Sequence, residues 1–165
     1  MRLPRWQRPG CGSGLVMPSN INFIIFAVKQ AKEAEAFGFT RNEACRNLKI
    51  ALHQYWQNKQ LRQHGQAHRD KIPMSKAAKT APKDQIQVEH AVPQQPIVNM
   101  LMDMEPLSEE GVGDVLTRLF RVRRVTKDEH ARLEAKGLRS KMPERWNGRD
   151  PWARYDAAGI KCPRD

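Results

Sequence analysis

The fold depends on residues 120–138, FRVRRVTKDEHARLEAKGL, which predict a short strand followed by a turn and a helix. Phe120, Val122 and Val125 make a short run of apolar and β-branched residues, and such a run suits a pleated, half-buried strand. The strand should end at Thr126, because the residues after it favour a helix.

The predicted helix has clear start and stop signals. Thr126 and Glu129 have capping-box spacing, in which each side chain can bond the backbone N–H of the other residue. The helix should therefore begin at Lys127. Gly137 can supply the left-handed residue that ends it.

Two potential metal ligands lie on this helix, and further polar candidates lie upstream. His130 and Glu134 are four residues apart, so both side chains project from one helical face. Residues 85–90, QIQVEH, alternate polar and apolar side chains, which is the period of a half-exposed strand. Glu89 and His90 end this strand. The sequence thus places an acid and a histidine before a strand and a helix that carries a second histidine.

This order of residues resembles the HNH, or ββα-metal, nuclease superfamily, and most closely its colicin-type DNases. The resemblance places Glu89 at the first metal ligand and His90 at the general base that activates water. It places Thr126 at the threonine of the turn, and His130 and Glu134 at the two ligands of the helix. The resemblance therefore implies a metal-dependent endonuclease that hydrolyses phosphodiester bonds.

The implied ligands and their surroundings indicate a cofactor and a partner. Two carboxylates and one imidazole are hard to borderline ligands, so Mg²⁺ or Mn²⁺ is the first expectation and Zn²⁺ the second. The expected partner is nucleic acid, DNA rather than RNA. Four arginines near the implied site are predicted to position the nucleic-acid strand: Arg121, Arg123, Arg124 and Arg132.

Two other function classes stay open. The asparagine that gives the superfamily its middle letter would fall near Arg121, which cannot tie the loop together in the same way. This departure favours a non-catalytic nucleic-acid-binding or inhibitory accessory protein of phage or plasmid type that keeps the ββα shape. The third class is a structural interaction module built on the N-terminal helices.

Composition limits the partners and the compartment. The chain has 165 residues, a formal net charge of +11 and a pI near 10.0, which favours a polyanion such as nucleic acid. An acidic protein partner is the alternative. Cys11, Cys45 and Cys162 are too widely spaced for a zinc ribbon or a disulfide framework, which favours a reduced, cytoplasmic setting. The apolar run 21–28 is too short to cross a membrane, so no membrane partner is expected.

The predicted fold class is α+β, with an N-terminal helical hairpin followed by a ββα-metal unit that contains a helical insertion. Capping residues at Ser19 and Thr40 begin the two helices of the hairpin, which is either a scaffold or a binding module for a protein partner. The predicted segments are a flexible basic arm 1–18, the hairpin 19–64, a basic linker 65–84, the ββα-metal unit 85–140 and a basic aromatic tail 141–165.

The insertion and the tail complete the predicted organisation. Residues 96–104 should form a short helix, and Ser108 can cap another that reaches Leu119. In the tail, Trp146 and Trp152 are predicted to cover the core. The tail arginines are predicted to contact nucleic acid.

Overall fold

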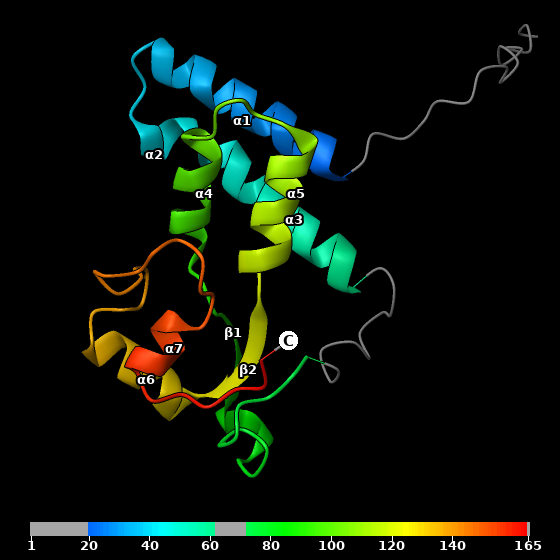
Figure 1. The fold of residues 1–165 in the computed structure, drawn as a ribbon. Coiled ribbons are helices and arrows are strands. Elements are labelled where there is room, and N and C mark those ends of the chain that lie inside the picture. The colour runs from blue at the N-terminus through cyan, green and yellow to red at the C-terminus, as the bar shows by residue number, and fades with distance from the viewer. Residues whose placement is uncertain (1–19, 62–71, 165) are drawn as a thin grey trace, which may run out of the picture.

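The computed structural model describes residues 20–61 and 72–164 (Figure 1). The predicted arm 1–18, Ser19 and residues 62–71 of the predicted linker lie outside these ranges. The described fold is mixed α and β, rich in helix, with one two-stranded antiparallel sheet. Within the same ranges, no helix combines the length and the apolar character needed to cross a membrane.

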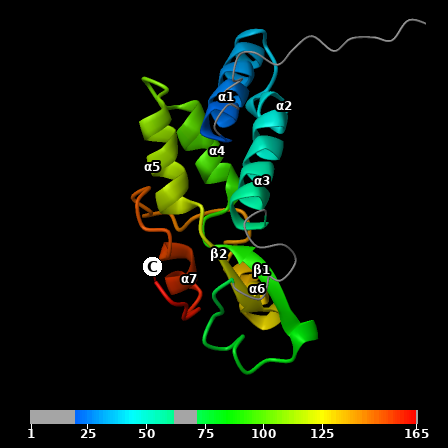
Figure 2. The same cartoon turned by 90° about the vertical axis from the view of Figure 1, so that its right-hand side faces the viewer.

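Five helices form one half of the molecule (Figures 1 and 2). They are α1 (Asn20–Ala36), α2 (Arg41–Ala44), α3 (Arg46–Leu61), α4 (Gln94–Met102) and α5 (Glu109–Leu119). Helix α3 returns alongside α1, and α1 also contacts α4 and α5. The predicted capping residues Thr40 and Ser108 are confirmed, but the second helix is interrupted at Cys45, which separates α2 from α3.

The strands and the last two helices form the other half. Strand β1 (Ile86–His90) follows a short 3-10 turn, η2 (Lys83–Gln85), and pairs antiparallel with β2 (Val122–Thr126). Helix α6 (Lys127–Ala135) follows β2 directly and contacts both strands. The register places Glu89 opposite Arg123 and His90 opposite Val122, so it fixes which face each candidate side chain occupies.

The predicted capping box at the start of α6 is confirmed. The Thr126 hydroxyl accepts from the Glu129 backbone N–H at 3.1 Å, and the Glu129 carboxylate accepts from the Thr126 N–H at 2.9 Å. Gly137 has a φ of 68°, as the predicted helix stop requires. Helix α6 is therefore fixed at both ends, and the positions of His130 and Glu134 follow from it.

Residues 72–84 differ from the predicted basic linker, because they pack against β2 and α6. Ile72 and Ala78 are buried, and the buried Ser75 hydroxyl donates to the Glu129 carboxylate at 2.6 Å. Apolar residues are sparse in this segment and have no helical or strand period, so the sequence pattern conceals its burial.

The C-terminal segment also packs against the sheet. Helix α7 (Ala153–Ala157) and its flanking residues form a second small core with the sheet and α6, separate from the core of the five helices. This core contains Val125, Leu133, Trp152, Tyr155 and Ile160. The prediction that Trp152 covers the core is confirmed, since only 6% of it is exposed.

Candidate functional site

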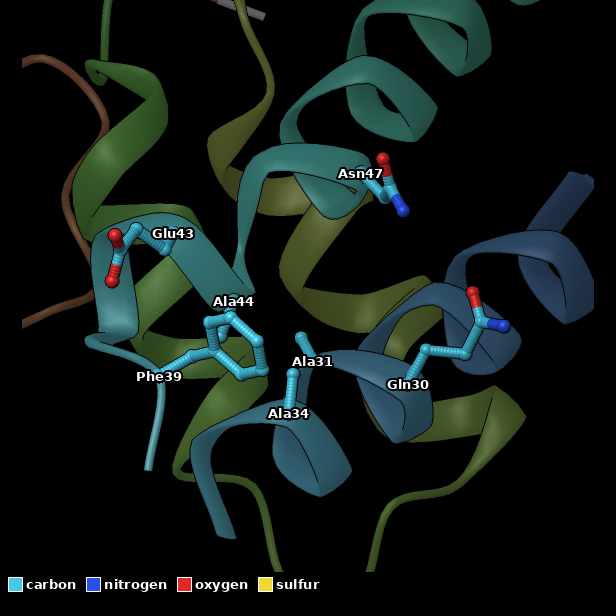
Figure 3. A pocket seen from close by; sticks show the side chains of 7 residues that line it. All are labelled: Gln30, Ala31, Ala34, Phe39, Glu43, Ala44 and Asn47. Atoms are coloured by element: carbon cyan, nitrogen blue, oxygen red, sulfur yellow. The ribbon is translucent and has the colours of Figure 1, made fainter. Parts of the chain in front are cut away.

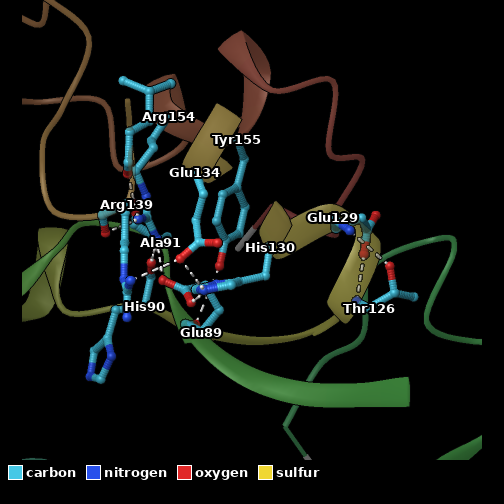
Figure 4. Close-up of polar contacts among 11 residues, drawn as sticks. Glu89, His90, Ala91, Thr126, Glu129, His130, Glu134, Arg139, Arg154 and Tyr155 are labelled. Atoms are coloured by element: carbon cyan, nitrogen blue, oxygen red, sulfur yellow. Dashed lines mark hydrogen bonds and ion pairs between the residues drawn. The ribbon is translucent and has the colours of Figure 1, made fainter. Parts of the chain in front are cut away.

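Three predicted site residues lie in one chain of contacts between β1 and α6 (Figure 4). One carboxylate oxygen of Glu89, Oε2, lies 2.8 Å from Nδ1 of His130, although the two residues are 41 positions apart in the chain. The other ring nitrogen of His130, Nε2, lies 3.6 Å from Oε1 of Glu134. The His130 ring therefore lies between two carboxylates.

Sequence reasoning did not include Arg154 in the site, although this residue is central to it. Arg154 is fully buried, and its guanidinium donates to Oε1 of Glu89 at 2.5 Å. Its remaining donors reach backbone carbonyls of β1 and of the segment after α6, at His90, Ala91, Leu138 and Arg139. The prediction that the tail arginines contact nucleic acid is therefore wrong for Arg154.

Two neighbours complete the polar network around Glu89. Burial raises the pKa of the Tyr155 phenol, so this group stays protonated, and it donates to the Glu89 backbone carbonyl at 3.3 Å. On the solvent side, Arg139 lies 3.0 Å from Oε1 of Glu134. The network is thus held rigidly at Glu89 and is open to solvent at Glu134.

His90 lies beside this network but turns away from the Glu89 carboxylate, as Figure 4 shows. Successive side chains of a strand point to opposite faces, which accounts for the separation. The ring of His90 packs against Phe120 with 5.5 Å between the ring centroids. Burial lowers the pKa of His90 below the ordinary histidine value; the Glu89 carboxylate opposes this shift, and positive charge on Arg154 and His53 adds to it. The imidazole is therefore neutral at neutral pH and can accept a proton.

An open cleft of about 300 Å³ borders His90. Residues of α3, β1, the first turn of α4 and the segment after α6 line it, and among them are Lys49, Glu89, Gln94 and Arg139. Two cationic side chains therefore share a cleft with a neutral imidazole. A phosphate group that entered the cleft would meet both a proton acceptor and positive charge.

The contacts allow a test of the predicted metal ligands. Two donors about 2.1 Å from one cation lie about 3.0 to 3.5 Å apart, close to the 3.6 Å between His130 Nε2 and Glu134 Oε1. Glu89 faces the opposite ring nitrogen, and its second oxygen is bonded to Arg154. His130 and Glu134 thus fit one cation once the exposed Arg139, which lies 3.0 Å from the same Oε1 of Glu134, moves away. Glu89 does not join them in this arrangement. Among the described residues, no three acidic, His or Cys side chains are grouped to hold a metal ion.

The predicted nucleic-acid-binding arginines are not all accessible. Arg123 is only 3% exposed; it donates to the carbonyls of Val122 and Pro163, and its guanidinium lies 4.5 Å from the Trp152 ring. The prediction of a surface role for Arg123 is therefore corrected. Arg124 is half-buried and donates to the Ile72 carbonyl at 3.0 Å.

Arg121 and Arg132 differ from this pair and from each other. Arg121 is half-buried, whereas the side chain of Arg132 is 51% exposed and lies 3.8 Å from the Glu129 carboxylate. Arg132 is therefore the one member of the predicted set that the structure places fully at the surface.

A second surface is more cationic than the predicted arginine set. It consists of five exposed lysines on segments that contact one another, which we call the lysine surface: Lys76, Lys79, Lys83, Lys127 and Lys161. The Lys76 backbone N–H donates to the Lys161 carbonyl at 2.7 Å, which joins two of these segments. None of the five ammonium groups forms an ion pair with another described residue. These ammonium groups are therefore not held in ion pairs by described residues, and two exposed acids, Asp84 and Asp128, lie on the same segments.

Another pocket, of about 310 Å³, lies among α1, α2 and α3 (Figure 3). Its polar lining includes Gln30, Asn47 and Glu43, whose carboxylate already accepts from Thr40 in a capping box. Apolar side chains line the rest: Ala31, Ala34, Ala44 and the ring of Phe39. The pocket has no proton acceptor comparable to His90, so the cleft beside β1 is the stronger functional candidate.

Comparison of the chain with protein-family models, curated proteins and solved structures gave no match. The functional assignment therefore depends on the geometry of the site.

Proposed function

We propose that this protein is an endonuclease that hydrolyses phosphodiester bonds of nucleic acid, and that its substrate is DNA rather than RNA. In this proposal β1, β2 and α6 form an HNH-like ββα unit, and α1 to α3 form the helical hairpin. The observation that carries the proposal is the contact between Glu89 of β1 and His130 of α6 beside a cleft that contains His90. Separate parts of the chain thereby supply a base, a cation-binding pair and positive charge.

His90 is the general base of the proposed reaction. It takes a proton from a water molecule, and the water oxygen attacks phosphorus. The bond between phosphorus and the leaving sugar oxygen breaks, and that oxygen takes a proton from solvent. Lys49 and Arg139 line the cleft and attract the phosphate.

A divalent cation would be held by His130 Nε2 and Glu134, which neighbour the His90 cleft through Arg139. There it would supply Lewis-acid stabilisation of the charge that develops on the phosphate. Mg²⁺ or Mn²⁺ remains the first expectation because a carboxylate is one of the two ligands, and Zn²⁺ the second because the other is an imidazole. Two protein ligands are typical of Mg²⁺, which keeps several waters.

A plasmid-nicking assay tests the proposal. Supercoiled DNA incubated with the protein and Mg²⁺, Mn²⁺ or Zn²⁺ should be converted to the open-circular form, and EDTA should abolish the conversion. The melting temperature should rise when the active metal is added, because a ligand that binds only the folded state stabilises it. If the protein binds DNA but does not cleave it with any of these metals, the proposed endonuclease activity is refuted.

A non-catalytic nucleic-acid-binding protein is the second candidate. The observation that favours it is the buried ion pair between Arg154 and Glu89, because a guanidinium occupies the carboxylate that the resemblance assigns to a metal. This candidate predicts DNA binding that is insensitive to EDTA and to replacement of His90.

The lysine surface predicts how nucleic acid binds. In a His90→Ala background, which slows cleavage, affinity for duplex DNA should fall steeply as salt rises, because bound lysines release counterions from the phosphates. Replacement of Lys76, Lys79 and Lys83 with Gln should reduce the slope of log K against log salt by about 1 for each lysine that contacts a phosphate. Fluorescence anisotropy at several salt concentrations measures the slope.

The matched control removes the same charge elsewhere, at three exposed cations of α1, α3 and the C-terminal segment: Lys29, Arg46 and Arg145. Replacement of these three with Gln should leave the slope nearly unchanged. Equal effects of the two triple variants would mean that net charge, and not the lysine surface, governs binding.

A further inference from the structure

Arg154 is held by more contacts than an ion pair needs. Its guanidinium bonds one carboxylate, that of Glu89, and carbonyls on both sides of it: His90 and Ala91 in and after β1, and Leu138 and Arg139 after α6. A planar guanidinium with this many partners has one orientation. The carboxylate that it bonds is therefore fixed in place as well.

The fixed carboxylate determines how His130 is oriented. Oε1 of Glu89 accepts from Arg154, which leaves Oε2 to face Nδ1 of His130 at 2.8 Å. A carboxylate oxygen only accepts hydrogen bonds, so a neutral His130 ring must carry its proton on Nδ1. The lone pair of Nε2 then points toward Glu134, which is 42% exposed.

We propose that Arg154 and Glu89 are positioning residues that hold His130 as the Nδ1–H tautomer and so present Nε2 as its reactive atom. The catalytic meaning of this inference rests on the proposed function, in which Nε2 and Glu134 hold the cation. A carboxylate that accepts from the second nitrogen of a ligating histidine fixes the tautomer and raises the basicity of the ligand. Glu89 is thus the orienting partner of His130 and not a third ligand.

Replacement of Glu89 with Gln tests both positioning residues together. Arg154 attracts the amide oxygen of the new side chain, so the amide NH₂ faces Nδ1 of His130. Nδ1 must then accept a hydrogen bond, and the ring proton moves to Nε2. If Arg154 did not orient the new amide, the amide oxygen would face Nδ1 and accept its proton, and the tautomer of His130 would not change.

The measurement is a long-range ¹H–¹⁵N correlation spectrum of the full chain with labelled histidine, recorded at mildly alkaline pH without metal or nucleic acid. The signal of His130 is the one that disappears in His130→Ala. The wild type should show Nδ1–H, and Glu89→Gln should show mainly Nε2–H. The matched control is Glu134→Gln, which changes the carboxylate on the other ring nitrogen and should leave Nδ1–H in place.

Each other outcome overturns the inference. A wild type with Nε2–H, an unchanged tautomer in a folded Glu89→Gln variant, or a tautomer that changes in Glu134→Gln would each do so. The wild-type spectrum alone decides if Glu89→Gln does not fold. Because the samples contain no nucleic acid, a protein with the expected tautomers that does not nick plasmid refutes only the proposed function.

Discussion

Replacement of His90 with Ala is expected to lower the rate of phosphodiester cleavage by about 10² to 10⁴, the usual contribution of a general base. The variant loses the imidazole that borders the cleft but keeps His130 and Glu134, which lie on another element. Metal-induced stabilisation should therefore persist. Single-turnover cleavage of plasmid, with a melting curve at each metal concentration, measures both quantities.

His130→Ala is the matched variant, because it should lose both cleavage and metal-induced stabilisation. If His90→Ala cleaves at the wild-type rate, His90 is not the base. If it loses metal stabilisation as fully as His130→Ala does, His90 is a ligand and the site must be redrawn.

The wild-type pH profile gives a further check on His90. The neutral imidazole is the active form, and burial lowers its pKa, so the cleavage rate should rise with pH with a midpoint below the ordinary histidine value. The charged groups that act on His90 are Glu89, Arg154 and His53. A midpoint above the ordinary histidine value would contradict the burial of the base.

Replacement of Arg154 with Met is expected to lower the free energy of unfolding by about 3 to 5 kcal/mol, the usual cost of removing one partner of a buried ion pair. The reason is that Glu89, only 14% exposed at its side chain, loses its countercharge, and the carbonyls around the guanidinium lose their donor. Urea unfolding followed by circular dichroism measures the change.

Arg139→Met is the control for Arg154→Met, since it removes an arginine of the same network whose side chain is 73% exposed. It should leave the free energy of unfolding nearly unchanged, because solvent screens exposed ion pairs. Adding Glu89→Leu to Arg154→Met should recover part of the lost stability by removing the uncompensated charge. No recovery would mean that the carbonyl contacts, and not the carboxylate, account for the loss.

Local signals in the sequence predicted much of the candidate site. The capping box of Thr126 and the stop at Gly137 located α6, and the alternation of residues 85–90 located β1. These signals act within a few residues of the chain, so they can be read without tertiary information. The placement of His130 and Glu134 on one helical face follows directly from them.

Such local signals do not predict contacts between segments that are distant in the sequence. Arg123 and the tail arginines, Arg154 among them, were predicted to contact nucleic acid, but both named residues are buried. Arg123 donates to backbone carbonyls and lies against the Trp152 ring, and Arg154 donates to Glu89 and to backbone carbonyls. A buried arginine depends on acceptors that the chain supplies tens of residues away. The aromatic neighbours of Arg154, Trp152 and Tyr155, were the available signal that this segment is interior.

The division of roles between Glu89 and His90 also depended on the structure. Adjacent strand residues point to opposite faces, and a shift of one residue in the pairing with β2 would exchange them. The sequence places both residues at the end of β1 but does not set this register. The pairing of Glu89 with Arg123 and of His90 with Val122 settles which residue meets His130.

Glu89 and Arg154 are 65 positions apart in the chain, so they do not leave the ribosome together. A ribosome makes the chain from its N-terminus, so β1, β2 and α6 leave it before Arg154 and Tyr155 do. Until those two residues are made, Glu89 lacks the Arg154 guanidinium that bonds its carboxylate and the Tyr155 phenol that bonds its backbone carbonyl. Residues 85–140 made as a separate fragment would keep this incomplete state, and the site can close only when the C-terminal helix has docked.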